Sequence, residues 1–114
     1  MALAIASREV DGVTVVELSG RITLGEGSVQ MRDALRDLIA KGQRRILLDL
    51  GEVSYIDSSG LGELVSAYTS AKNQSATLKL LKLTKKVHDL LQLTKLYTVF
   101  EIFDDEASAI ASFK

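Results

Sequence analysis

Residues 46–68, ILLDLGEVSYIDSSGLGELVSAY, decide the fold that we expect for this chain. The segment opens with Ile46 to Leu50, a short apolar run without helical spacing, which is typical of a strand buried on both faces of a parallel sheet. Apolar residues then recur at the spacing of one helical face: Leu61, Leu64, Val65 and Tyr68. An acid, two hydroxyls and two glycines lie between strand and helix. Open α/β sheets bind ligands and partners at such strand ends, so we place any site here.

The composition is typical of a soluble globular domain, which we expect to span residues 1–114. Hydrophobic residues make up 46% and charged residues 25% of the chain, and the formal net charge is −1. This balance gives no overall field that attracts nucleic acid or an anionic membrane, so we expect neither as a partner. No apolar run approaches the roughly 20 residues that span a bilayer, and the N-terminal residues do not resemble a signal peptide. We therefore expect a cytoplasmic protein.

Residue types that usually hold metals are scarce. The chain has no cysteine and one histidine, His88. A disulfide framework, a thiolate nucleophile and a cysteine metal site are excluded, and a zinc site would need carboxylates almost alone. We therefore expect no metal and no cofactor, and we interpret His88 as a solvated helix residue.

The first half of the chain predicts a hairpin and then a helix. Two β-rich runs at 3–8 and 13–19 flank Asp11-Gly12, a dipeptide that favours the positive φ angles of a type I′ turn. A glycine-containing loop is expected at 20–27. A helical face of Met31, Leu35, Leu38 and Ile39 follows, and Gly42 ends that helix. Asp49 and Glu52 are interpreted as polar groups at the end of the central strand and in the loop after it.

The second half predicts two further strand–helix pairs. The helix that begins after residue 57 fades by Asn73, and alternating leucines predict a strand at 77–83. Thr84 is placed to cap a helix with Val87, Leu90 and Leu91 on its inner face. A last strand is expected at 97–103, before a final helix whose first turn carries acids that suit its dipole.

Together these elements predict an α/β fold in the order β-β-α-β-α-β-α-β-α. Crossovers through helices imply parallel strands, and the first hairpin adds an antiparallel edge. We expect a mixed sheet of four to five strands packed with about four helices.

The tetrapeptide Asp57-Ser58-Ser59-Gly60 has two interpretations. In the simpler one, an Asp or Ser side chain caps the helix by accepting hydrogen bonds from its unpaired N–H groups, and glycine fits the tight turn. Two adjacent hydroxyls and two glycines exceed what a cap requires, however. In the sharper interpretation a serine is phosphorylated at the helix N-terminus, which adds a charge of about −1.5 to −2. Beside Asp57 and inside an interface, that charge would break a complex.

Enzymatic interpretations fit the residues poorly, so no catalytic residue is assigned. A nucleophile elbow needs Gly-x-Ser-x-Gly, and Tyr55 or Ile56 stands where the first glycine would be. Gly25-Glu26-Gly27 lacks the Lys-Ser/Thr ending of a phosphate loop. A receiver domain phosphorylated on Asp57 would need a metal-binding acid cluster after the first strands, which the sequence does not contain.

The sequence resembles the bacterial anti-sigma factor antagonists, the stand-alone members of the sulphate transporter and anti-sigma antagonist (STAS) domain family. The similarity runs over nearly the whole length and is most specific in Val53 to Gly62, VSYIDSSGLG. The flanking matches lie at residues 16–22, 46–50, 87–96 and 100–109.

The resemblance implies a partner-switching regulator. In that family the unmodified protein binds a serine-kinase anti-sigma factor and so frees a sigma factor. The kinase then phosphorylates the serine after the aspartate, which corresponds to Ser58, with Ser59 as a minor alternative, and the complex separates. A metal-dependent phosphatase of the PP2C type restores the hydroxyl, so ATP and metal belong to the partners. The implied partner-binding residues are Thr23, Leu24, Asp57, Ser59, Gly60, Leu61 and Gly62.

One departure from the family pattern bears on the function, and two other functions stay open. Where the family usually has glycine, an acid, an aliphatic residue and another acid, this chain has Gly20-Arg21-Ile22-Thr23, without either acid. The change bears on which kinase is recognised. A constitutive scaffold of the same fold, such as an accessory subunit of a transporter or sensory complex, is the first alternative. A sensor that binds a small molecule or nucleotide is the second, and it would need an apolar pocket.

Overall fold

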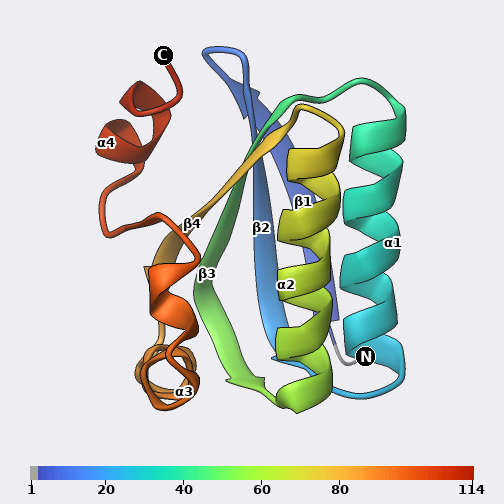
Figure 1. Ribbon diagram of the computed structural model, residues 1–114, viewed down its shortest axis with the longest axis vertical. Coiled ribbons are helices and arrows are strands. Elements are labelled where there is room, and N and C mark those ends of the chain that lie inside the picture. The colour runs from blue at the N-terminus through green and yellow to red at the C-terminus, as the bar shows by residue number, and fades with distance from the viewer. Residues whose placement is uncertain (1–2) are drawn as a thin grey trace.

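The computed structural model describes residues 3–114, which form one mixed sheet with helices on both faces (Figure 1). Its strands lie in the order β1-β2-β3-β4-β5. β1 and β2 are antiparallel, and every other neighbouring pair is parallel. The predicted α/β class and mixed sheet are confirmed, with these strand bounds: β1 Leu3–Val10, β2 Val13–Ile22, β3 Arg45–Ile56, β4 Thr77–Leu83 and β5 Ile102–Phe103.

Helices connect the parallel strands and cover the sheet unequally. The two longest, α1 and α2, pack side by side on one face, while the short α4 lies on the opposite side and α3 lies near the end of β3 (Figure 1). The described chain contains four α-helices and one 3₁₀ turn: α1 Glu26–Ala40, α2 Ser58–Asn73, α3 Lys85–Thr94, η1 Leu96–Thr98 and α4 Glu106–Ala111.

β3 is the buried strand on which both layers pack. Ile46, Leu47, Leu48 and Leu50 are fully buried. Ile46, Leu48 and Leu50 belong to the main core beneath α1 and α2, whereas Leu47 packs with Ala109 and Ile110 of α4 in a smaller cluster. The apolar run without helical spacing therefore corresponds to a strand covered on both faces, as the sequence predicted.

Most element ends follow the predicted local signals. Asp11 and Gly12 have φ angles of 50° and 81° in the β1–β2 turn, as a type I′ turn requires. Gly42 has a φ of 94° just after α1, and its backbone N–H donates to the Ile39 carbonyl. Thr84 caps α3 by accepting a hydrogen bond from the Val87 N–H.

Parts of two predicted loops are in fact strand. β2 continues to Ile22 and β3 to Ile56, so Gly20 lies in a strand and Glu52 does not lie in a loop. The two strands stay paired through Arg21–Tyr55 and Ile22–Ile56, with register shifts earlier in the pair. These irregular pairs break the alternation of apolar and polar residues, and for this reason the pattern predicted strand ends that are too early.

The predicted last strand, 97–103, is also wrong in its extent. Its first part is the 3₁₀ turn Leu96–Thr98, and only Ile102–Phe103 pair with β4. The apolar residues of segment 97–103 are explained by packing rather than by strand pairing. Phe100 is buried, and the centre of its ring lies 5.2 Å from that of Tyr68 of α2.

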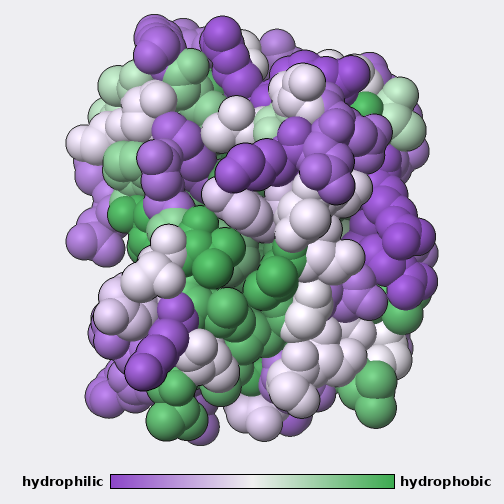
Figure 2. All heavy atoms as spheres, in the orientation of Figure 1, coloured by the Kyte–Doolittle hydropathy of each residue, from purple (hydrophilic) through white to green (hydrophobic). Residues whose placement is uncertain are grey.

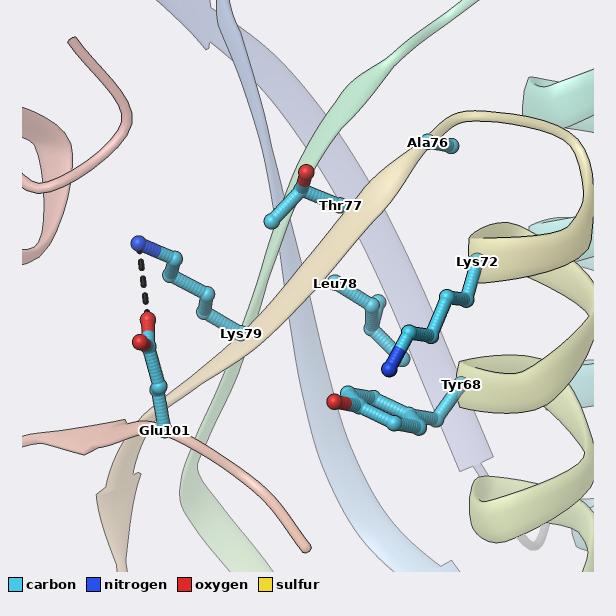
Figure 3. A pocket seen from close by; sticks show the side chains of 7 residues that line it. All are labelled: Tyr68, Lys72, Ala76, Thr77, Leu78, Lys79 and Glu101. Atoms are coloured by element: carbon cyan, nitrogen blue, oxygen red, sulfur yellow. Dashed lines mark ion pairs between the residues drawn. The ribbon is translucent and has the colours of Figure 1, made fainter.

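A buried lysine fastens the C-terminal segment to the sheet. Lys79 of β4 is only 9% exposed. Its Nζ donates hydrogen bonds to the Ser112 carbonyl at 3.0 Å and to Ser112 Oγ at 2.9 Å, and it lies 2.8 Å from a Glu101 carboxylate oxygen (Figure 3). The ammonium is also 4.7 Å from the centre of the Phe113 ring. These partners offset the cost of burying the charge.

The end of α3 offers a test of backbone strain. Lys95 follows the helix in the left-handed conformation, with φ 63° and ψ 16°. A residue with a Cβ pays an energetic cost there that glycine avoids. We expect Lys95→Gly to raise the free energy of unfolding by about 0.5–1 kcal/mol in urea titrations. Lys95→Ala keeps the Cβ and is the matched control; an equal gain from both variants would show that backbone strain is not the cause.

Candidate functional site

The site predicted at the strand-to-helix turn lies at one end of the sheet, where β3 passes into α2 (Figure 1). The β2–α1 loop, residues 23–25, lies at the same end. The backbone N–H of Asp57 donates to the Ile22 carbonyl at 3.2 Å. This bond holds the last residues of β2 against the turn, so two segments that are 35 residues apart (57 − 22) meet in one surface.

The Asp57 carboxylate joins these two segments. Oδ1 accepts a hydrogen bond from the Gly60 N–H at 2.9 Å, which caps α2, and Oδ2 accepts one from the Leu24 N–H at 2.9 Å. These backbone donors lower the pKa of Asp57 below its ordinary value, and the hydrogen bond from Gly60 has the largest effect. Asp57 is therefore both the predicted helix cap and a connection to the β2–α1 loop.

The two serines differ in accessibility. Ser58 is exposed, whereas Ser59 is half-buried. Within the described residues the Ser58 hydroxyl has no hydrogen-bond partner. Because Ser58 is the first residue of α2, a group added to its oxygen would lie at the positive end of the helix dipole.

Gly60 and Leu61 were expected among the partner-binding residues, but both are buried. A Cβ on Gly60 would lie 2.2 Å from the Ile22 carbonyl oxygen and 2.7 Å from the Ile22 side chain. Glycine is thus required by the close approach of β2 inside this protein, not by a partner. Leu61 is 5% exposed and belongs to the main core, so neither residue offers a side chain to a partner.

The other expected contacts remain accessible. Gly62 is exposed, and a Cβ there would meet nothing within 4 Å. Leu24 is 79% exposed at the tip of the β2–α1 loop, and Thr23 beside it is half-buried. The accessible surface therefore combines the start of α2 with an apolar loop residue.

Three further residues at this end were not predicted as site residues. Tyr55 is 39% exposed just before the turn. The Arg21 guanidinium carbon lies 5.4 Å and the Lys86 Nζ lies 5.9 Å from the centre of its ring. The sequence shows an aromatic residue near Ser58, but it gives no sign that a lysine from α3 meets it.

The described chain also has features away from this turn. Among residues 3–114 no group of three or more His, Cys, Asp or Glu side chains could hold a metal ion, and no helix is long and apolar enough to cross a membrane. A hollow between α2 and β4 is lined by Tyr68, Lys72 and Lys79, among others (Figure 3). It adjoins the later turns of α2, away from Ser58.

Comparison with known proteins identifies the family. Residues 4–109 match the STAS domain. The chain belongs to the STAS domain family.

This STAS domain is similar in sequence to curated relatives and in fold to solved structures. It is 29% identical to the anti-sigma F factor antagonist of Paenibacillus polymyxa, over 96% of this chain and 94% of the relative. It is 32% identical to the anti-sigma-B factor antagonist of Bacillus subtilis, over 76% and 78% of the two chains. The fold is shared with an anti-sigma factor antagonist from Mycobacterium paratuberculosis, with a TM-score of 0.83, 20% identity and 97% and 93% coverage. Unphosphorylated SpoIIAA is also similar, with a TM-score of 0.80, 21% identity and 96% coverage of each chain.

The two glycines of the turn provide a matched pair of substitutions. Gly60→Ala places a methyl group against the Ile22 carbonyl, and we expect a loss of about 2–3 kcal/mol or more in the free energy of unfolding. Gly62→Ala lies in open space within a helix and should be neutral or stabilising by up to about 1 kcal/mol. Urea unfolding of both variants measures the difference; equal stabilities would contradict the close approach.

The double role of Asp57 predicts a pH-dependent loss of stability. An Asn side chain has one acceptor oxygen for two N–H donors, so we expect Asp57→Asn to cost about 1–2 kcal/mol at pH 7. Because folding lowers the pKa of Asp57, its stabilisation is complete above the unfolded value of about 3.9 and fades as the pH falls through the folded value.

Chemical unfolding of wild type and Asp57→Asn between pH 7 and pH 2 tests this dependence. The stability gap should narrow in acid. A gap that stays constant over the whole range would mean that the ionised carboxylate is not the stabilising species.

Proposed function

We propose that this STAS domain is an anti-sigma factor antagonist of the cytoplasm. In its unphosphorylated state it binds a serine-kinase anti-sigma factor and thereby releases a sigma factor. Phosphorylation of Ser58 ends the interaction. The protein acts by binding, and its relatives from Paenibacillus polymyxa and Bacillus subtilis carry the names of anti-sigma factor antagonists.

The observation that supports the proposal most is the exposure of Ser58 directly after the Asp57 cap. A kinase can reach this hydroxyl without unfolding the turn, whereas Ser59 is half-buried. The cap and the helix are already formed around the unmodified serine, because Asp57 supplies the hydrogen bonds to Gly60 and Leu24. The phosphate is therefore not needed for folding, and we expect it to change the affinity for a partner at this surface.

Added charge provides the switch. A phosphate on Ser58 brings a charge of about −1.5 to −2 next to the ionised Asp57. At the protein surface this charge is hydrated and is tolerated by the helix N-terminus. Under a docked partner it would lose its hydration beside another anion, which costs several kcal/mol unless the partner supplies cations. The complex is therefore weakened while the fold remains intact.

Apolar surface beside this turn supports a protein partner. Figure 2 shows hydrophobic atoms gathered in the lower half of the face that carries α2 and α3. Half-buried apolar side chains from α2, from α3 and from the segment after α3 pack on the main core: Val65, Leu90, Leu96 and Val99. The exposed Leu24 lies at the same end of the molecule. An apolar surface next to a modifiable hydroxyl suits an interface that a single charge can disrupt.

The remaining chemistry is assigned to the partners. The kinase supplies ATP and its metal, and a phosphatase of the PP2C type removes the phosphate from Ser58. This STAS domain then needs only to present the hydroxyl, the loop at Thr23 and Leu24, and the exposed start of α2 at Ser59 and Gly62.

Substitutions at Ser58 test the switch. We expect Ser58→Ala to bind the serine-kinase anti-sigma factor with nearly wild-type affinity, because the hydroxyl is small. Ser58→Asp should lose about 2 kcal/mol or more, the scale of an unpaired charge under an interface. Isothermal titration calorimetry measures both. Ser66→Asp, which adds the same charge to an exposed position two turns along α2, serves as the control and should bind nearly normally.

Phosphorylation itself is tested by incubating the protein with ATP and each serine-kinase anti-sigma factor of the organism that encodes it. Mass spectrometry should locate one phosphate on Ser58. Absence of modification at Ser58 with every kinase, together with equal affinities of the Ala and Asp variants, would favour a constitutive scaffold.

A further inference from the structure

Arg21, Tyr55 and Lys86 form an exposed cationic cluster around one aromatic ring beside the turn. The Arg21 guanidinium carbon and the Lys86 Nζ lie 5.4 and 5.9 Å from the ring centre, within the range of a cation–π interaction. Tyr55 keeps 39% of its surface exposed. Its Cα lies three residues before that of Ser58, and therefore at most about 11 Å away.

Contacts from three elements hold the cluster together. Arg21 and Tyr55 are partners in the parallel pairing of β2 and β3. Thr84 Oγ1 donates a hydrogen bond to the Val53 carbonyl at 2.8 Å, which fixes the start of α3, with Lys86 in its first turn, against the end of β3. The two cations are therefore placed by the fold rather than by local sequence.

Neither cation is neutralised within the described chain. Among residues 3–114, no Asp or Glu oxygen lies within 4.0 Å of the charged nitrogens of Arg21 or Lys86. The neighbouring Lys85 differs, because its Nζ lies 2.9 Å from a carboxylate oxygen of Asp89. The cluster thus presents two uncompensated positive charges over an aromatic surface.

These charges restrict what can cover Tyr55. A partner that buries the ring also removes water from the two cations, and this desolvation is costly unless the partner supplies anions. Exposed Tyr and Arg side chains are also among the residue types that most often carry binding energy. We propose that Arg21, Tyr55 and Lys86 form a specificity-determining surface that docks against a carboxylate-bearing patch on the serine-kinase anti-sigma factor.

This inference rests on the proposed function and names the chemistry of the partner surface. The family pattern has acids where this chain has Arg21 and Thr23, so a kinase suited to acids at this loop should bind poorly here. The cluster would thereby separate this antagonist from related antagonists with other kinases.

Association kinetics provide the test. The probe is each purified serine-kinase anti-sigma factor of the organism that encodes the chain, first without and then with bound nucleotide, at 50 and 300 mM NaCl. At low salt we expect Arg21→Gln and Lys86→Gln each to slow association about threefold, and the double variant about tenfold. The double variant should also show a weaker dependence on salt, because fewer charges are left to screen.

Two controls make the result specific. Lys85→Gln removes a neighbouring charge that is already paired, so its association rate should stay near that of wild type. Replacing a carboxylate in the facing patch of the kinase by lysine should restore binding of Arg21→Glu. Circular dichroism melting curves confirm that each variant is folded.

Three outcomes would overturn the inference. Wild-type association rates and salt dependence in the double variant would show that the cations remain in water in the complex. An effect that requires bound nucleotide would mean that they face phosphates instead of carboxylates. If Ser58→Asp still abolishes binding in these cases, the proposed function stands without this inference. Binding to no kinase at all would overturn both.

Discussion

The Asp57 carboxylate is the interaction on which the site depends. One oxygen caps α2 through the Gly60 N–H, and the other holds the β2–α1 loop through the Leu24 N–H. Without this bridge the helix would begin without its cap and the loop would be free to move away. With it, Ser58 and Leu24 form one surface whose shape exists before any partner binds, so less order must be gained on binding.

The turn separates residues that maintain the fold from the serine that we propose to be phosphorylated. Gly60 and Leu61 face inward, where β2 passes too close for a side chain on Gly60. Ser58 faces solvent, so chemistry on its oxygen does not alter the core. A charge added to Ser58 should therefore change the free energy of binding strongly and the free energy of unfolding only slightly. Under the proposed function, this division would let the domain lose its partner without refolding.

Local sequence signals predicted much of this arrangement. The run Ile46–Leu50 predicted a strand buried on both faces, and Asp11-Gly12, Gly42, Thr84 and Asp57 marked element ends correctly. Local signals are less informative where contacts between distant segments determine the structure. Gly60 appeared to be a surface feature because its neighbour, the Ile22 carbonyl, is 38 residues away (60 − 22) in the chain. The Arg21–Tyr55–Lys86 cluster was missed for the same reason, since the placement of α3 depends on Thr84 and Val53.

The central claim is that a charge on Ser58 separates the partners while leaving the fold unchanged. The most direct measurement is the affinity of the serine-kinase anti-sigma factor for this protein with phosphoserine incorporated at position 58, compared with the unmodified protein and with phosphoserine at position 66. We expect the affinity to fall by at least about 30-fold, the equivalent of about 2 kcal/mol, for phosphoserine at position 58 alone, with unchanged melting behaviour. Equal affinity of the phosphorylated and unmodified proteins would contradict it.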